Sequence, residues 1–159
     1  MQQEVKSIKV RDLVAGFANT EEAGIRGYNG KLDIRPAYQR EFVYDLEKQV
    51  AVINTIMKGC CLNLFQWAKN DDGTYEVLDG QQRTLSICGF VNGGFSYQGR
   101  FFNNLQEDEK EVILNHDLIV NMIEGTPSEK LEWFKHQKEE IGISWFDDFE
   151  IRFRKDMEE

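Results

Sequence analysis

The sequence feature that most constrains the fold is the stretch from Thr74 to Val91, TYEVLDGQQRTLSICGFV. Its first five residues alternate in polarity and favour a strand, Asp79-Gly80 is typical of a turn, and apolar residues recur at helical spacing after Thr84. The stretch therefore predicts a strand, a tight turn and a helix in direct succession. Gly80 lets the backbone approach a ligand closely, and the first amides of the helix can face an anion.

Four polar side chains fill this junction, namely Asp79, Gln81, Gln82 and Arg83. Solvated polar turns before a helix are common. Here, however, two amides and an arginine, all hydrogen-bond donors, follow the carboxylate without an apolar residue between them, and this density favours a ligand site. Arg83 would present a planar fork to phosphate oxygens, unless it is a structural ion-pair partner of Asp79. We expect its guanidinium to face solvent.

The catalytic candidates at this junction are Asp79, Gln81 and Gln82. Both glutamines can donate to phosphate or orient an attacking water. Asp79 can hold a magnesium ion or a water, or it can cap the following helix. The sequence leaves these roles of Asp79 open.

A second segment rich in phosphate-binding groups lies upstream, from Leu32 to Tyr44, LDIRPAYQREFVY. Arginines interleaved with aromatic residues suit a nucleotide or a nucleic acid, because the cations contact phosphates and the rings stack on bases. The alternative is that the aromatic residues belong to the core and only the arginines face solvent. The residues predicted to bind a nucleotide or phosphate are Arg35, Tyr38, Gln39, Arg40, Gly80 and Arg83.

The sequence DGQQR after a short strand resembles the signature of the N-terminal domain of GmrSD-type, modification-dependent restriction endonucleases, a branch of the ParB/sulfiredoxin-like superfamily. The upstream segment resembles the R-P-x-Y-Q-R-x-[FY]-V-[WY] motif of the same family. The similarity runs from about Val5 to Phe134. It implies an α+β fold in which helices flank a small mixed sheet or partial barrel, with the signature loop at a helix N-terminus. It also implies that Gln39 and Arg40 approach the DGQQR loop.

Resemblance and residues together predict a domain that binds and hydrolyses a nucleoside triphosphate in a restriction or phage-defence system. A nuclease domain or subunit would be its partner. The alternative is a non-catalytic DNA-binding or assembly module, with DNA or a second copy of the chain as partner. The HNH nuclease domain of such enzymes is not recognisable here, so we expect no DNA cleavage by this chain alone. Gln81 and Gln82 replace the cysteine and histidine of sulfiredoxins, so sulfinic acid repair does not carry over.

Charge and composition exclude several other classes. Residues 104–159 hold 16 acidic and 7 basic side chains, whereas residues 1–103 hold 12 of each. A basic face along the whole chain for a DNA duplex is therefore not expected, although local phosphate binding is. Cys60, Cys61 and Cys88 are expected in the core, and neither they nor the two histidines have the spacing of a metal centre. Without a long apolar run or a secretory signal, we expect a cytoplasmic protein with no membrane segment.

The remaining pattern of hairpins interspersed with helices predicts one α+β domain over residues 1–159, with an acidic, helical C-terminal third at 104–159. Asn29-Gly30 predicts a hairpin with a two-residue turn.

Two further segments predict helices. Asp45 is the expected N-cap of a helix from Leu46 to Lys58, with Leu46 on the buried face. The stretch from Ser144 to Phe153 places four aromatic residues near helical spacing, so it should pack on this domain or on a partner.

Overall fold

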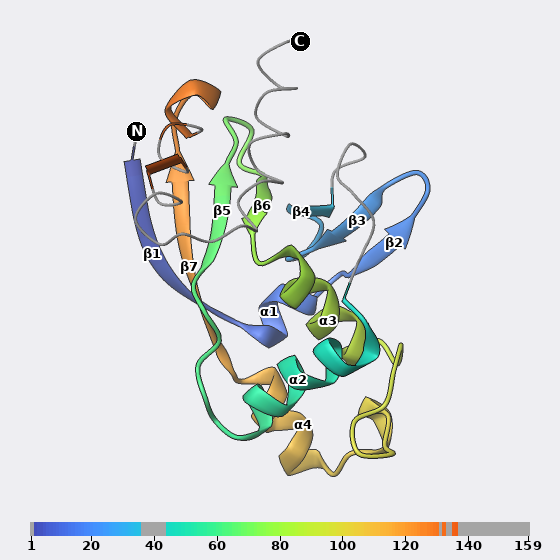
Figure 1. Cartoon of the computed structure of the whole chain (residues 1–159). Helices are drawn as coiled ribbons and strands as arrows, with labels where there is room; N and C mark the ends of the chain where they lie inside the picture. The colour runs from blue at the N-terminus through green and yellow to red at the C-terminus, as the bar shows by residue number, and fades with distance from the viewer. Residues whose placement is uncertain (1, 36–43, 131, 133–134, 137–159) are drawn as a thin grey trace.

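A seven-stranded mixed sheet forms the centre of the molecule, in the order β1-β7-β5-β6-β4-β3-β2 (Figure 1). The structure, a computed structural model, describes residues 2–35, 44–130, 132 and 135–136. The strands are β1 (Gln2–Lys9), β2 (Ala18–Thr20), β3 (Gly24–Gly27), β4 (Leu32–Arg35), β5 (Phe65–Lys69), β6 (Tyr75–Asp79) and β7 (Asp117–Glu124). The helices are α1 (Val10–Val14), α2 (Leu46–Met57), α3 (Gln81–Val91), the 3₁₀ helix η1 (Phe102–Asn104) and α4 (Glu107–Leu114). The predicted α+β class is confirmed.

The sheet combines antiparallel hairpins with two parallel pairings. The hairpin of β5 and β6 lies between β7 and β4, and it pairs in parallel with both of them. Strand β1 pairs antiparallel with β7 over its whole length, from Gln2 opposite Glu124 to Lys9 opposite Asp117. Strand β6 of this central hairpin thus ends at Asp79, just before the start of α3.

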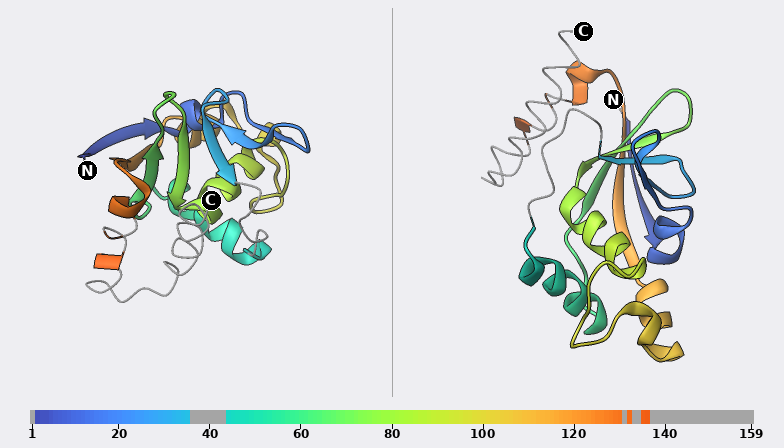
Figure 2. Two further views of the ribbon diagram at one scale, coloured as in Figure 1. Left: turned by 90° about the horizontal axis from the view of Figure 1, so that it is seen from above. Right: turned by 90° about the vertical axis from the view of Figure 1, so that its right-hand side faces the viewer.

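Helices α2 and α3 lie together on one side of the sheet (Figure 2). Their buried residues include Ile53 and Ile56 on α2 and Ile87 and Phe90 on α3. At about 25 cal/mol per Å² of apolar surface removed from water, this burial contributes much of the stability of such a layer. Aromatic rings on or next to the strands join the same core, since the ring centroid of Trp67 lies 5.4 Å from that of Tyr28 and 5.7 Å from that of Tyr75.

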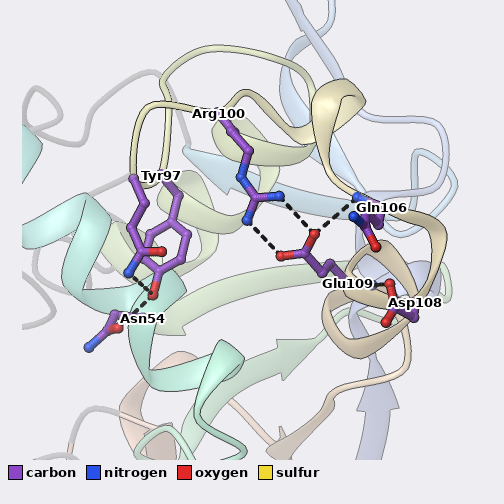
Figure 3. Close-up of polar contacts among 7 residues, drawn as sticks. Asn54, Tyr97, Arg100, Gln106, Asp108 and Glu109 are labelled. Atoms are coloured by element: carbon purple, nitrogen blue, oxygen red, sulfur yellow. Dashed lines mark hydrogen bonds and ion pairs between the residues drawn. The ribbon is translucent and has the colours of Figure 1, made fainter.

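A polar network joins α2, the segment after α3, and α4 (Figure 3). Arg100 forms a two-pronged ion pair with Glu109 of α4, at 2.8 and 2.7 Å. Glu109 also accepts a hydrogen bond from the backbone amide of Gln106, which completes the capping box of α4. The Tyr97 hydroxyl donates to Oδ1 of Asn54 at 2.7 Å, which ties this segment to α2.

The hairpin at Asn29-Gly30 is present, but its turn is longer than the predicted two residues. Gly27 pairs with Leu32, so four residues form the loop. Tyr28 and Asn29 have φ of 51° and 60°, and their amides donate to the carbonyl oxygens of Leu13 and Ala15, both at 2.7 Å. The loop leaves the ladder because its backbone bonds the end of α1 instead.

Helix α2 begins as predicted but buries a different set of side chains. The Asp45 carboxylate accepts a hydrogen bond from the Lys48 amide at 2.9 Å, as expected of an N-cap. Leu46 is 58% exposed, so its predicted inward position is wrong. The buried face of α2 is instead formed by Val52, Ile53 and Ile56, so it is rotated around the helix axis from the predicted one.

The cysteines and the chain ends give a mixed outcome. Cys88 is buried as predicted, whereas Cys60 and Cys61 are exposed, because they follow the end of α2 in a loop rather than on its buried face. The Thr126 hydroxyl and the Glu129 carboxylate exchange hydrogen bonds with each other's backbone amides, as expected at a helix start. In the described parts of the chain, no helix has the length and apolar character to cross a bilayer. The aromatic stretch from Ser144 to Phe153 lies outside the described residues.

Candidate functional site

Helix α3 begins one residue after β6 ends, and Gly80 makes this abrupt junction possible. Gly80 is the N-cap and has a φ of 97°, a left-handed conformation that residues with side chains rarely adopt. A methyl group at this position would also overlap the Phe65 ring, with Cε2 at 2.9 Å. The glycine is therefore required both by the turn and by the packing of β5 beneath it. The first amides of α3, which have no acceptor within the helix, follow directly.

The sequence predicts that Arg83 extends into solvent, and this prediction is wrong. Its side chain is only 14% exposed, and its Cζ lies 4.2 Å from the centroid of the Phe65 ring. Nη1 donates to the carbonyl oxygen of Asn63, and Nη2 donates to that of Leu64 at 3.2 Å. The solvent-facing prediction fails because the turn at Gly80 points the first turn of α3 back over β5. Arg83 thereby fixes the loop before β5 to the start of α3.

Asp79 is the buried partner of this arginine. Its Oδ2 lies 3.7 Å from Nη2 of Arg83, and the residue is 8% exposed. Burial raises the pKa of Asp79 to about 7, although the positive charge of Arg83 and a hydrogen bond from the Gly80 amide both lower it. Burial likewise lowers the pKa of Arg83, against the attraction of Asp79. The structural ion pair that the sequence left open is therefore present.

Gln81 and Gln82 each bond to a different part of the upstream segment. Nε2 of Gln81 donates to the carbonyl oxygen of Ile34 at 3.2 Å. Oε1 of Gln82 accepts a hydrogen bond from the backbone amide of Tyr44, also at 3.2 Å. Ile34 lies in β4 and Tyr44 lies just before α2, so the two glutamines hold both flanks of the arginine-rich segment at the start of α3.

The predicted residues within that segment lie outside what the structure describes. This applies to Tyr38, Gln39 and Arg40. The backbone of Arg35 ends β4, with its Cα paired to that of Ile25. The approach of Arg40 to Arg83 therefore stays a prediction, and what supports it is the pair of glutamine contacts on either side.

The comparison with protein families covers most of these elements. A model of the family described as GmrSD restriction endonuclease, N-terminal domain, matches residues 22–157. The chain belongs to this family. The matched range contains both the upstream segment and the DGQQR junction, whereas β1, α1 and β2 precede it. Searches among curated proteins and among solved structures each returned no match.

The partners of Arg83 are the part of this GmrSD N-terminal domain that the sequence did not reveal. Asn63, Leu64 and Phe65 supply two carbonyl oxygens and a ring face to one guanidinium. Backbone carbonyl groups leave no signature in a sequence, since every residue has one. Phe65 is one of eleven phenylalanines, and its residue type alone does not set it apart from the others.

A protein-held magnesium ion fits this junction poorly. Within the described ranges, no group of three or more His, Cys, Asp or Glu side chains could hold a metal ion. Asp79 is the only carboxylate of the DGQQR sequence, and the adjacent guanidinium opposes a second cation. A proton competes at this carboxylate near neutral pH, because burial raises its pKa to about 7. A magnesium ion at this junction would therefore need further ligands besides Asp79.

Proposed function

We propose that this chain binds a nucleoside triphosphate at the start of α3 and hydrolyses it within a restriction system, so gating a separate nuclease domain or subunit. The family match supports the restriction context, because the matched domain is the N-terminal part of a restriction endonuclease. We infer a ParB/sulfiredoxin-like arrangement of sheet and signature loop, which the strand, turn and helix at Asp79-Gly80 support.

One observation carries the proposal. Gln81 and Gln82 bond the two flanks of the upstream segment, at Ile34 and Tyr44, so this segment departs from and returns to the same helix start. Arg35 and Arg40 belong to it, and helix amides with nearby guanidinium groups make an anion site. Two stretches that are separate in the sequence and rich in phosphate-binding groups would then serve one ligand.

The proposed roles follow from the remaining hydrogen-bonding capacity of each group. The amides that follow Gly80, together with Arg35 and Arg40, neutralise the phosphates, while Tyr38 and Gln39 contact the rest of the nucleotide. Arg83 has five N–H groups, so those not bonded to Asn63 and Leu64 can still reach a phosphate oxygen. Gln81 donates through Nε2, which leaves its Oε1 able to accept from an attacking water.

The reaction would be an in-line attack of that water on the terminal phosphorus. The bond from phosphorus to the bridging oxygen breaks as the new one forms, and the water proton passes to solvent or to a phosphate oxygen. Asp79 can take part as a base only when it is ionised. Because its pKa is about 7, the ionised fraction of Asp79 changes strongly with pH around neutrality.

A second candidate function is a non-catalytic module that binds DNA or organises the assembly. The observation that favours it is that the polar groups of the junction already have structural partners. Arg83 holds the loop before β5, and both glutamines hold the flanks of the upstream segment. A phosphate of DNA could then be held without any group placed to activate water.

Turnover separates the two functions. The purified chain is titrated with the four common nucleoside triphosphates and magnesium in a calorimeter, and phosphate release is followed with and without DNA. Hydrolysis predicts binding and release by the wild type, with release lost in Gln81→Ala. The matched control is Asn103→Ala, an exposed carboxamide in η1. Binding of a triphosphate or of DNA without release would favour the second function, and failure to bind either would refute both.

A further inference from the structure

Strand β1 forms one edge of the sheet and is unusually open for an edge strand. Within the described residues it pairs only with β7. It is eight residues long, its register with β7 is unbroken, and every residue except Ile8 is exposed, with Val5 at 64%. Edge strands are commonly protected by proline, charged side chains, a bulge or a covering element, because their free amides and carbonyls can pair with another strand. The sequence of β1, QQEVKSIK, contains no proline.

The alternation of the backbone identifies which residues of β1 face the open edge. The Val10 amide donates to the carbonyl oxygen of His116 at 2.9 Å, so residue 10 points toward β7 and its neighbouring loop. In an extended strand, alternate residues direct their N–H and C=O groups to the same side. Even-numbered residues of β1 therefore point toward β7, and Gln3, Val5 and Ser7 point their backbone groups away from the sheet.

We propose that two copies of this chain associate through β1, antiparallel about a twofold axis at Val5, so that two seven-stranded sheets become one. In this register Val5 pairs with Val5 of the second copy, and Gln3 pairs with Ser7. Each of these pairs exchanges two backbone hydrogen bonds. The exposed Val5 side chains meet at the axis, which removes an apolar surface from water on both copies.

Charge selects this register over its neighbours. With the axis at Val5, Glu4 of each copy lies opposite Lys6 of the other, in the close pairs between the hydrogen-bonded ones. These two side chains already attract each other within one chain, at 3.8 Å, and they are 69% and 48% exposed. Moving the axis by one residue places Glu4 opposite Glu4 or Lys6 opposite Lys6. The strand is therefore self-complementary in backbone, apolar and charged groups at one register, as a twofold interface requires.

The dimer should be weak and reversible. Pairing along one edge buries less than the roughly 1,200 Å² at which standard interfaces begin. The strand lies on the sheet edge away from α2 and from the DGQQR junction (Figure 2), so pairing leaves that junction open. The inference does not depend on the proposed nucleotide chemistry.

Charge reversal tests the register. Sedimentation of the full chain, from about 5 µM to about 1 mM, should show a monomer–dimer equilibrium for the wild type. Glu4→Lys alone puts lysine opposite Lys6, and Lys6→Glu alone puts glutamate opposite Glu4, so each variant should be monomeric. An equimolar mixture of these two variants should dimerise again, as should the chain that carries both substitutions. A wild type that stays monomeric, or single variants that dimerise as the wild type does, would overturn the proposal.

Backbone exchange tests the edge itself. At high protein concentration the Val5 amide should exchange with solvent deuterium more slowly than at low concentration, whereas the Lys6 amide, which faces β7, should not change. Val5→Pro removes the outward amide without touching the β7 ladder, so it should give a folded monomer with an unchanged melting temperature. Dimers that persist in Val5→Pro, with no protection of Val5, would place the interface elsewhere.

Discussion

Replacing Asp79 by asparagine should change how the stability of this domain depends on pH. Asparagine keeps the shape of the side chain and removes its ionisation. Burial raises the pKa of Asp79 to about 7, from an ordinary value of 3.8, and the side chain is 11% exposed. Between these two pH values, therefore, the Asp79 carboxyl keeps a proton in the folded chain that it has already released in the unfolded chain.

The sign and size of the effect follow from this difference. Because the pKa is higher in the folded state, the contribution is fully present below pH 3.8 and is lost as the pH rises toward 7. The total corresponds to about 4 kcal/mol of unfolding free energy, of which about 2 kcal/mol is lost between pH 5 and pH 7. For a chain of this length, that loss lowers the melting temperature by about 4 to 8 °C.

Thermal or urea unfolding of both proteins across this range is the assay. The wild type should lose stability from pH 5 to pH 7 relative to Asp79→Asn, and the variant should be the more stable protein at pH 8. The difference between the curves cancels His116, whose pKa burial lowers and whose contribution has the opposite slope. Parallel curves for the two proteins would refute the argument, because Asp79 would then titrate alike in the folded and unfolded chains.

Three further substitutions test the junction and its neighbouring helix by urea unfolding. Gly80→Ala should lower the free energy of unfolding by about 3 kcal/mol, because alanine would be strained at this φ and would overlap Phe65. The control Gly73→Ala also has a positive φ, of 84°, but faces open space, so it should cost about 1 kcal/mol. Equal losses in the two variants would contradict the overlap with Phe65. Arg83→Ala should destabilise the ligand-free domain by about 2 to 4 kcal/mol, since it leaves two carbonyl groups and a buried carboxyl without their partner. The same change at the more exposed Arg100 should have a smaller effect, so the reverse order would count against the structural role. Asp45→Ala should cost about 1 kcal/mol through loss of the cap on α2, and an unchanged midpoint would argue against that cap.

Much of the framework could be predicted because it depends on local signals. Strand β6, the turn at Gly80 and helix α3 follow from alternation, a glycine and helical spacing, all within one stretch. The N-cap at Asp45 depends on a hydrogen bond that spans three residues. The segment after α3 forms one isolated bridge, between Tyr97 and Arg100, before the chain enters η1.

The failures concern interactions between distant parts of the chain. The burial of Arg83 depends on carbonyl groups about twenty residues upstream, and the length of the Tyr28 loop depends on the end of α1. The exposure of Cys60 and Cys61 depends on where α2 stops relative to the sheet. None of these is encoded in the spacing of residue types. The nucleotide-binding roles of Tyr38, Gln39 and Arg40 stay predictions.

The pairing of β1 with β7 also bears on how this chain is made. Strand β1 finds its partner only after Asp117 to Glu124 have been synthesised. At about 5 to 20 residues per second, the nascent chain waits on the order of ten seconds with this strand unpaired. Contacts so distant in the sequence are also the slowest to form. Until β7 has been synthesised, both edges of β1 are open to pairing with other nascent chains. Misassembly through β1 is therefore most to be expected during this interval.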